Sequence, residues 1–242
     1  MNIRNGAAAL ALLTLAGTSG AGIIFSGTSG SHAASAEFSV SPSGELVVTL
    51  TNTSAADVLV PSDILTAVFF NVTGGALTLT RDSAVLGAGS SVLYDPQGQP
   101  AGGVVGGEWA YRGGSLNIGT PGSRGHGISS TGVGLFNSSD LFPGPDLQPP
   151  ASPNGLEYGI TSAGDNIATG NGGVTGSGGL IKNAVVFTLG GVGANFDLSR
   201  IGNVYFFYGT AINEGGFDGN VPTPGAVSLL GLAGIASLRR RR

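Results

Sequence analysis

The stretch ELVVTLTN at residues 45–52 has the alternation that is typical of a half-buried β-strand. Leu46, Val48 and Leu50 fall on one face, whereas Thr49 and Thr51 fall on the other. Successive side chains of a strand point to opposite faces, so this pattern predicts one face against a core and one toward solvent. The chain is therefore expected to contain a sheet with a buried side.

A second stretch, LTAVFFNV at residues 65–72, is apolar on both faces and predicts a central strand between two layers. Further candidate strands are 77–86, 107–112, 116–118, 132–137, 158–161, 184–189 and 204–210. The pieces 107–112 and 116–118 predict a hairpin that turns at Gly113-Gly114. No stretch between 37 and 220 keeps a period near 3.6 residues, so we expect an all-β fold. It is predicted to be a single β-sandwich, jelly-roll-like, with long Gly/Pro-rich loops.

Two of these loops are long. Residues 141–155 (LFPGPDLQPPASPNG) contain five prolines, and residues 164–179 (GDNIATGNGGVTGSGG) are polar and rich in glycine. Proline cannot donate a ladder hydrogen bond, so the first segment predicts a surface excursion and not a central strand. Neither loop divides the chain into two domains.

The N-terminus has the features of an export signal, which is predicted to be helical. Arg4 supplies a positive charge, and residues 6–17 (GAAALALLTLAG) form an apolar core of the right length. Ala34-Ser35-Ala36 matches a small-x-small cleavage site, which would place cleavage before Glu37. We therefore predict a signal peptide over 1–36 and a folded domain over 37–220.

The C-terminus reads VPTPGAVSLLGLAGIASLRRRR at residues 221–242. A helix over 225–238 would rise about 21 Å, which is short for a hydrocarbon core of about 30 Å. The following cluster, Arg239, Arg240, Arg241 and Arg242, is expected to stay on the cytoplasmic side. An ordinary helix packed on the domain would be amphipathic, but this one is apolar nearly all round. A short transmembrane helix that anchors the chain transiently is the better prediction.

An export signal combined with a proline motif, a short apolar helix and terminal arginines resembles the PEP-CTERM proteins, the bacterial substrates of exosortase. The usual motif is Val-Pro-Glu-Pro, and here it is Val221-Pro222-Thr223-Pro224, with Thr223 in place of the glutamate. Residues 152–166 and 180–190 are similar to one family of exosortase-dependent surface proteins. The resemblance implies secretion, transient membrane insertion and tail processing over 221–242 by an exosortase-type enzyme. It leaves open whether the new C-terminus is free or covalently attached.

Charge and composition exclude several classes of function. Between residues 37 and 220 there are five basic and fourteen acidic residues, and the chain contains no cysteine. Five scattered cations do not form the basic patch that a nucleic-acid or anionic-membrane surface requires. Without cysteine there is no disulfide, thiol nucleophile or thiolate metal site.

The candidates for chemistry are few. His32 falls in the predicted signal peptide, so His126, expected in a solvated loop at 122–127, would be the single imidazole of the mature chain. One histidine without a nucleophile motif does not predict a hydrolase. No zinc or cofactor site is predicted. Asp165, with Asn166, Asn171 and glycine carbonyls nearby, is a weak calcium candidate, because its spacing matches no EF-hand and an ordinary Asn/Asp/Gly turn is the better explanation.

Trp109 and Tyr111 lie two residues apart, so both rings fall on the same side of a predicted strand. If they are exposed, they could stack on a sugar ring. If they are buried, they are part of the sandwich core. We therefore predict a non-enzymatic, exported protein of the cell surface or extracellular matrix with a structural or interaction role. The alternative is a carbohydrate-binding module delivered by the same route, with extracellular polysaccharide as its partner.

Overall fold

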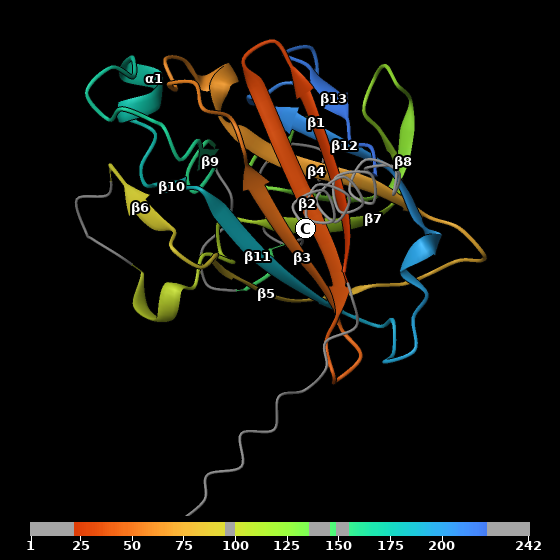
Figure 1. Ribbon diagram of the computed structural model, residues 1–242. Coiled ribbons are helices and arrows are strands. Elements are labelled where there is room, and N and C mark those ends of the chain that lie inside the picture. Colours follow the sequence, from red (N-terminus) through yellow and green to blue (C-terminus); the bar gives the residue numbers. More distant parts are fainter. Residues whose placement is uncertain (1–21, 95–99, 136–145, 149–154, 222–242) are drawn as a thin grey trace, which may run out of the picture.

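The structure, a computed structural model of the 242-residue chain, describes residues 22–94, 100–135, 146–148 and 155–221. The apolar stretch 6–17 and the tail from Pro222 to Arg242 lie outside these ranges, so their assigned roles stay predictions. The described chain is mostly β and forms two sheets around a buried core (Figure 1). The predicted all-β sandwich is confirmed.

The first sheet has five antiparallel strands in the order β1-β2-β3-β11-β5. The strands are β1 (Ile23–Ser29), β2 (His32–Val40), β3 (Leu46–Asn52), β5 (Thr80–Leu86) and β11 (Ala184–Gly190). The first three follow one another as a meander, whereas β5 and β11 come from distant parts of the chain. In β3, Leu46, Val48 and Leu50 are fully buried and the residues between them are partly exposed, as the sequence predicts.

The second sheet has eight strands, with the main path β13-β12-β4-β9-β10-β6 and a side branch in which β8 joins β4 and β7 joins β8. The strands are β4 (Leu65–Val72), β6 (Ser91–Leu93), β7 (Ala110–Asn117), β8 (Ser123–Ser129), β9 (Ile160–Thr161), β10 (Leu180–Lys182), β12 (Ile201–Tyr208) and β13 (Gly216–Asp218). β4 lies between β12 on one side and β8 and β9 on the other, which confirms the predicted central strand. The helical elements are η1 (Pro61–Asp63), η2 (Ala101–Gly103), α1 (Gly172–Thr175) and η3 (Leu198–Arg200).

Aromatic rings fill the space between the two sheets. Phe38 of β2 packs edge-on against Phe70 of β4, with ring centroids 5.2 Å apart, and Trp109 packs against Phe187 of β11 at 4.8 Å. On the opposite face of β4, Phe69 belongs to a second apolar cluster. β4 is apolar on both faces because both faces are covered.

The N-terminal boundary differs from the prediction. β1 and the first half of β2 precede Glu37, and every residue of β1 pairs with β2. Ala34 and Ala36 are both fully buried on the inward face of β2. In the first half of β2 the inward-facing residues are small and alternate with the outward-facing ones, so the sequence of this strand has the same small-x-small pattern as a signal-peptide cleavage site. The predicted cleavage point falls inside β2, so the folded domain begins earlier than residue 37.

The predicted hairpin at Gly113-Gly114 is also corrected. β7 runs without a turn from Ala110 to Asn117, with an irregularity in its pairing between Gly113 and Leu116. The chain turns instead where Ile118 N–H donates to the Gly122 carbonyl. Glycine marks a bulge here because an extended strand can bend at a residue without a Cβ atom. The predicted strand at 132–137 is a turn over its described part, 132–135.

Candidate functional site

Trp109 and Tyr111 lie in the core and not on the surface. Trp109 is fully buried, and its indole N–H donates to the Tyr158 carbonyl at 3.1 Å. Tyr111 is only 6% exposed, and its hydroxyl lies 2.8 Å from Nδ1 of His126. Both side chains belong to the main core cluster, so they do face the same side. Neither ring is available to stack on a sugar, and the predicted glycan contact at these two residues is corrected.

His126 lies on β8 and not in a solvated loop. Its ring is buried, stacks on Phe70 with centroids 5.1 Å apart, and contacts the Tyr111 hydroxyl. Burial lowers the pKa of His126, because the charged imidazolium would lose its hydration. The same burial raises the pKa of Tyr111. This pair forms a polar contact inside the core and is closed to a substrate.

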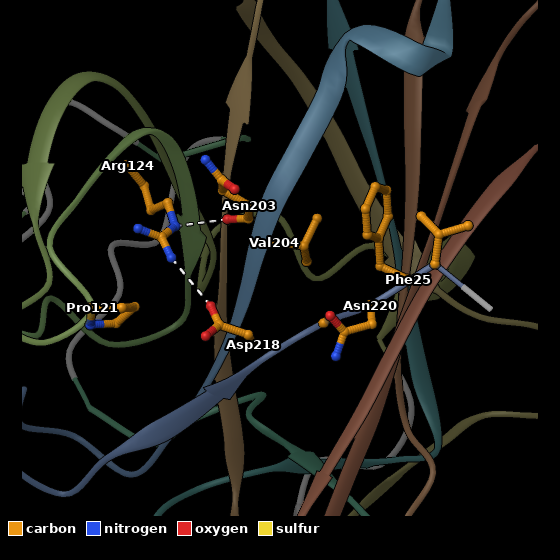
Figure 2. Close-up of a pocket in the computed structure, with 9 residues that line it drawn as sticks. Phe25, Pro121, Arg124, Asn203, Val204, Asp218 and Asn220 are labelled. Carbon is orange, nitrogen blue, oxygen red and sulfur yellow. Dashed lines mark hydrogen bonds and ion pairs between the residues drawn. The ribbon is translucent and has the colours of Figure 1, made fainter. Parts of the chain in front are cut away.

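The described residues also enclose an open pocket of about 520 Å³ beside β12 and β13 (Figure 2). Its volume lies in the range of ordinary ligand sites. The lining residues are Phe25, Pro121, Arg124, Asn203, Val204, Asp218, Gly219, Asn220 and Val221. They come from β1, from β8 and the turn before it, from β12, and from β13 and the chain that follows it. The pocket thus lies where the two ends of the described chain meet.

Arg124 is the central charged group of this pocket. Its side chain is only 7% exposed, and Figure 2 shows it directed toward both Asn203 and Asp218. Nε donates to the Asn203 carbonyl at 2.7 Å, Nη1 donates to the Ser123 carbonyl at 3.2 Å, and Nη2 lies 3.2 Å from Asp218 Oδ1. The guanidinium also lies over the Tyr205 ring, 5.9 Å from its centroid. Arginine has five N–H donors, so this arrangement fixes the guanidinium and leaves donors for a ligand.

The remaining polar groups of the pocket are a carboxylate and two amides. The Asp218 side chain is 58% exposed, and Asn203 and Asn220 line the same pocket (Figure 2). Asn203 has a φ of 49°, in the left-handed region that asparagine tolerates better than most residues. This pocket was not predicted from the sequence, because Arg124 and Asp218 lie far apart in the chain and belong to no common sequence motif.

Asp165 lies beside Asp57 in a second polar cluster, formed by the loops after β3 and β9. The Val58 N–H lies 3.1 Å from Oδ1 of each of these two carboxylates. Burial raises the pKa of Asp165 and the neighbouring Asp57 carboxylate raises it further, although the hydrogen bond from the Val58 N–H acts in the opposite direction. In contrast, hydrogen bonds from Thr169 and the Asn166 N–H lower the pKa of Asp57. The two acids therefore have opposite electrostatic environments.

The neighbouring asparagines already have structural partners. Asn171 caps α1, with its side chain accepting from Gly173 N–H and Val174 N–H, and the Asn166 side chain accepts from Ala168 N–H. Across the described ranges, no group of three or more His, Asp or Glu side chains is placed to hold a metal ion. Any cation at Asp57 and Asp165 would need neutral oxygen ligands as well.

The predicted sorting residues lie almost wholly outside the described ranges. Of the tail, only Val221 is described, and it is 44% exposed. Within the described part of the chain, no helix is long and apolar enough to cross a membrane. Comparison of the chain with protein-family models, with curated proteins and with solved structures found no match.

Proposed function

We propose that the chain is an exported protein of the cell surface or extracellular matrix, whose C-terminal signal is processed by an exosortase-type enzyme. The observation that carries this proposal is the position of Val221. Asn220 is held by two backbone hydrogen bonds to Ser26, and the next residue, Val221, is exposed and begins the proline motif. A processing motif that begins where the hydrogen-bonded domain ends is accessible to a protease.

The proposal includes a revised export signal. Cleavage after Ala36 would remove β1 and half of β2, so a site upstream of Ile23 fits the fold better. Ser19-Gly20-Ala21 is a small-x-small sequence that follows the apolar core 6–17 by one residue. We expect signal peptidase to cleave after Ala21, so that the mature chain starts at Gly22 and retains the whole first sheet.

The exported domain is proposed to have a structural or interaction role without catalysis, and to need no cofactor. The positions of its two imidazoles support this role. His126 is buried against Tyr111, and His32 stacks on Tyr208 with centroids 4.3 Å apart while pairing with Asp63 at 3.1 Å. The acidic character of the domain favours partners other than nucleic acid. The jelly-roll-like connectivity of the sandwich is a further part of the proposal.

The test is intact-mass analysis and terminal peptide mapping of the full chain, made in hosts with and without the sorting enzyme. We expect a form that starts at Gly22 and ends within 221–224 when the enzyme is present, and a retained tail when it is absent. Thr223→Glu restores the family motif and should increase processing, whereas Thr53→Glu adds the same charge at an exposed site and should not. Recovery of the terminal arginines in envelope-bound protein from the complete host would refute the proposal.

The second candidate is a carbohydrate-binding module whose site is the Arg124 pocket. An open pocket with a fixed guanidinium, a half-exposed carboxylate and two amides offers the donors and acceptors that recognise sugar hydroxyls. A glycan array and calorimetry with each positive sugar test this candidate. Asp218→Asn should weaken binding at least several-fold, while Asp82→Asn, at an exposed position in β5, should leave it unchanged. No binding to any glycan would reject it.

A further inference from the structure

The cluster at Asp57 and Asp165 contains two like charges that face one backbone donor. Each carboxylate places its Oδ1 atom 3.1 Å from the Val58 nitrogen, so these two oxygens are no more than about 6 Å apart. Like charges at such a separation repel, and the repulsion grows as they are withdrawn from water. Asp165 is only 7% exposed, so the folded chain must offset this repulsion.

No cation within the described ranges does so. The ion pairs formed there are His32 with Asp63 and Arg124 with Asp218, and neither includes Asp57 or Asp165. The donors that reach Asp57 are neutral, namely backbone N–H groups and the Thr169 hydroxyl. Neutral hydrogen bonds stabilise each carboxylate separately but leave the net charge of the pair in place.

Three buried oxygen atoms in this part of the structure lack a hydrogen bond of good geometry. They are Oδ2 of Asp165, Oγ1 of Thr161 and the hydroxyl oxygen of Tyr94. Thr161 is fully buried at the end of β9, and its hydroxyl faces Asp165 as a donor that lowers the pKa of that carboxyl. Tyr94 packs against the apolar cluster that contains Val58, and burial, followed by the charges of Asp165 and Asp57, raises the pKa of its hydroxyl. Buried oxygens are nearly always paired, and such a group indicates a missing ligand.

We propose that Asp57, Asp165 and Thr161 bind a divalent cation, and that Ca²⁺ is the ion that fits best. All the available atoms are hard oxygen donors, without a cysteine or a free imidazole, which suits Ca²⁺ and not zinc. Ca²⁺ also accepts irregular geometry, whereas Mg²⁺ requires a nearly ideal octahedron. A small cavity of about 10 Å³ lies beside Asp57, with Val58 and Ser162 also in its lining, and offers space for a water ligand.

The expected affinity is low. The site would have two charged ligands, the carboxylates, and one neutral ligand, the hydroxyl, which is less charge than high-affinity Ca²⁺ sites provide. We therefore expect a Kd of about 0.1–1 mM, as in weak extracellular Ca²⁺-binding modules. An ion that binds only the folded state raises the melting temperature as its concentration passes the Kd. For a domain of this size, 10 mM Ca²⁺ should raise Tm by about 3–10 °C, with the larger shift at the lower Kd.

The test is thermal unfolding of the full chain after EDTA treatment and dialysis, with CaCl₂ titrated from micromolar to 10 mM. MgCl₂ and NaCl at matched ionic strength are the ion controls. Tb³⁺ gives a direct readout, because a tyrosine close to a bound lanthanide sensitises its luminescence. We expect sensitised emission that Ca²⁺ displaces and that Tyr94→Phe decreases.

Two variants separate the site from general effects of charge. Asp165→Asn should abolish the response of Tm to Ca²⁺, whereas Asp82→Asn should retain it. Thr161→Val replaces a hydroxyl that lacks a well-formed hydrogen bond with a methyl group of similar size, so it should weaken Ca²⁺ binding several-fold and change Tm in EDTA by little.

Equal shifts with CaCl₂ and NaCl, or an unchanged Ca²⁺ response in Asp165→Asn, would overturn the proposal. A Tm that does not change with Ca²⁺ would also overturn it, and a pH dependence of Tm that Asp165→Asn removes would then show that the two carboxylates share a proton instead. These outcomes do not depend on how the termini are processed, so the cation site and the proposed export can fail separately.

Discussion

Ser26 and Asn220 exchange two backbone hydrogen bonds, with nitrogen–oxygen distances of 2.9 and 2.8 Å, and thereby join the beginning of the folded chain to its end. Ser26 lies on β1, the edge strand of the first sheet, and Asn220 follows β13, the edge strand of the second. An unpaired edge strand can pair with another chain and so promote aggregation. Here the edge strand of each sheet lies against the edge of the other, so both are covered (Figure 1).

This closure predicts a strict requirement for glycine at position 27. A Cβ atom there would lie 2.5 Å from the Asp218 carbonyl oxygen and 2.9 Å from Cδ2 of Phe217. Gly27→Ala should therefore lower the free energy of unfolding by about 1–3 kcal/mol, because the two edges must move apart. Urea denaturation measures the change.

Gly202→Ala, where nothing lies within 4 Å of the new Cβ, is the control and should change stability by less than about 1 kcal/mol. Equal losses in both variants would contradict the closure.

The N-terminal boundary gives a second prediction. A chain that starts at Gly22 keeps β1 and all of β2, whereas a chain that starts at Glu37 loses the closure and exposes the edge of β3. It also loses Phe25, which packs edge-on against Phe38 with centroids 5.8 Å apart. We expect the longer form to unfold cooperatively and the shorter form to aggregate or lack a cooperative transition. Circular dichroism melting and size-exclusion chromatography distinguish them. A shorter form of equal stability would show that the first 15 residues from Gly22 are dispensable.

The sequence predicted regular, strongly patterned elements well. Leu46, Val48 and Leu50 revealed β3 because its other face is partly exposed, and LTAVFFNV revealed β4 because both of its faces are covered. β2 was hidden because its inward residues include Ala34 and Ala36, whose small side chains carry little hydrophobic signal. The pocket was unpredictable, since it depends on Arg124 meeting a carbonyl on β12 and a carboxylate on β13. Such contacts are set by the three-dimensional arrangement of the strands and leave no local pattern.

The buried imidazole of His126 predicts a pH dependence of stability. Its pKa is lowered in the folded state by burial, so between that value and the ordinary pKa of about 6.5 the unfolded chain binds more protons. Stability is therefore highest above about pH 6.5 and decreases as the pH falls below it, by at most about 1.4 kcal/mol per pH unit. Urea denaturation between pH 7.5 and 5 should show this decrease. His126→Gln should flatten it, whereas His32→Gln leaves the buried imidazole in place and should retain it. An unchanged slope in His126→Gln would assign the effect to carboxyl groups.

The Arg124 pocket predicts unequal roles for the two members of its ion pair. Arg124 is almost wholly buried and donates to the Asn203 and Ser123 carbonyls, so Arg124→Met removes two hydrogen bonds and should lower the free energy of unfolding by about 1–3 kcal/mol. Asp218 is 58% exposed, and an ion pair of this kind contributes about 0–1 kcal/mol, so Asp218→Asn should have little effect.

Urea denaturation of both variants at low and high salt is the measurement. The small effect of Asp218→Asn should disappear in high salt, because screening removes what the exposed charge contributes. The loss in Arg124→Met should persist, because it arises from hydrogen bonds to neutral carbonyls. Equal, salt-sensitive losses in the two variants would mean that the ion pair stabilises the pocket and that the hydrogen bond to β12 does not.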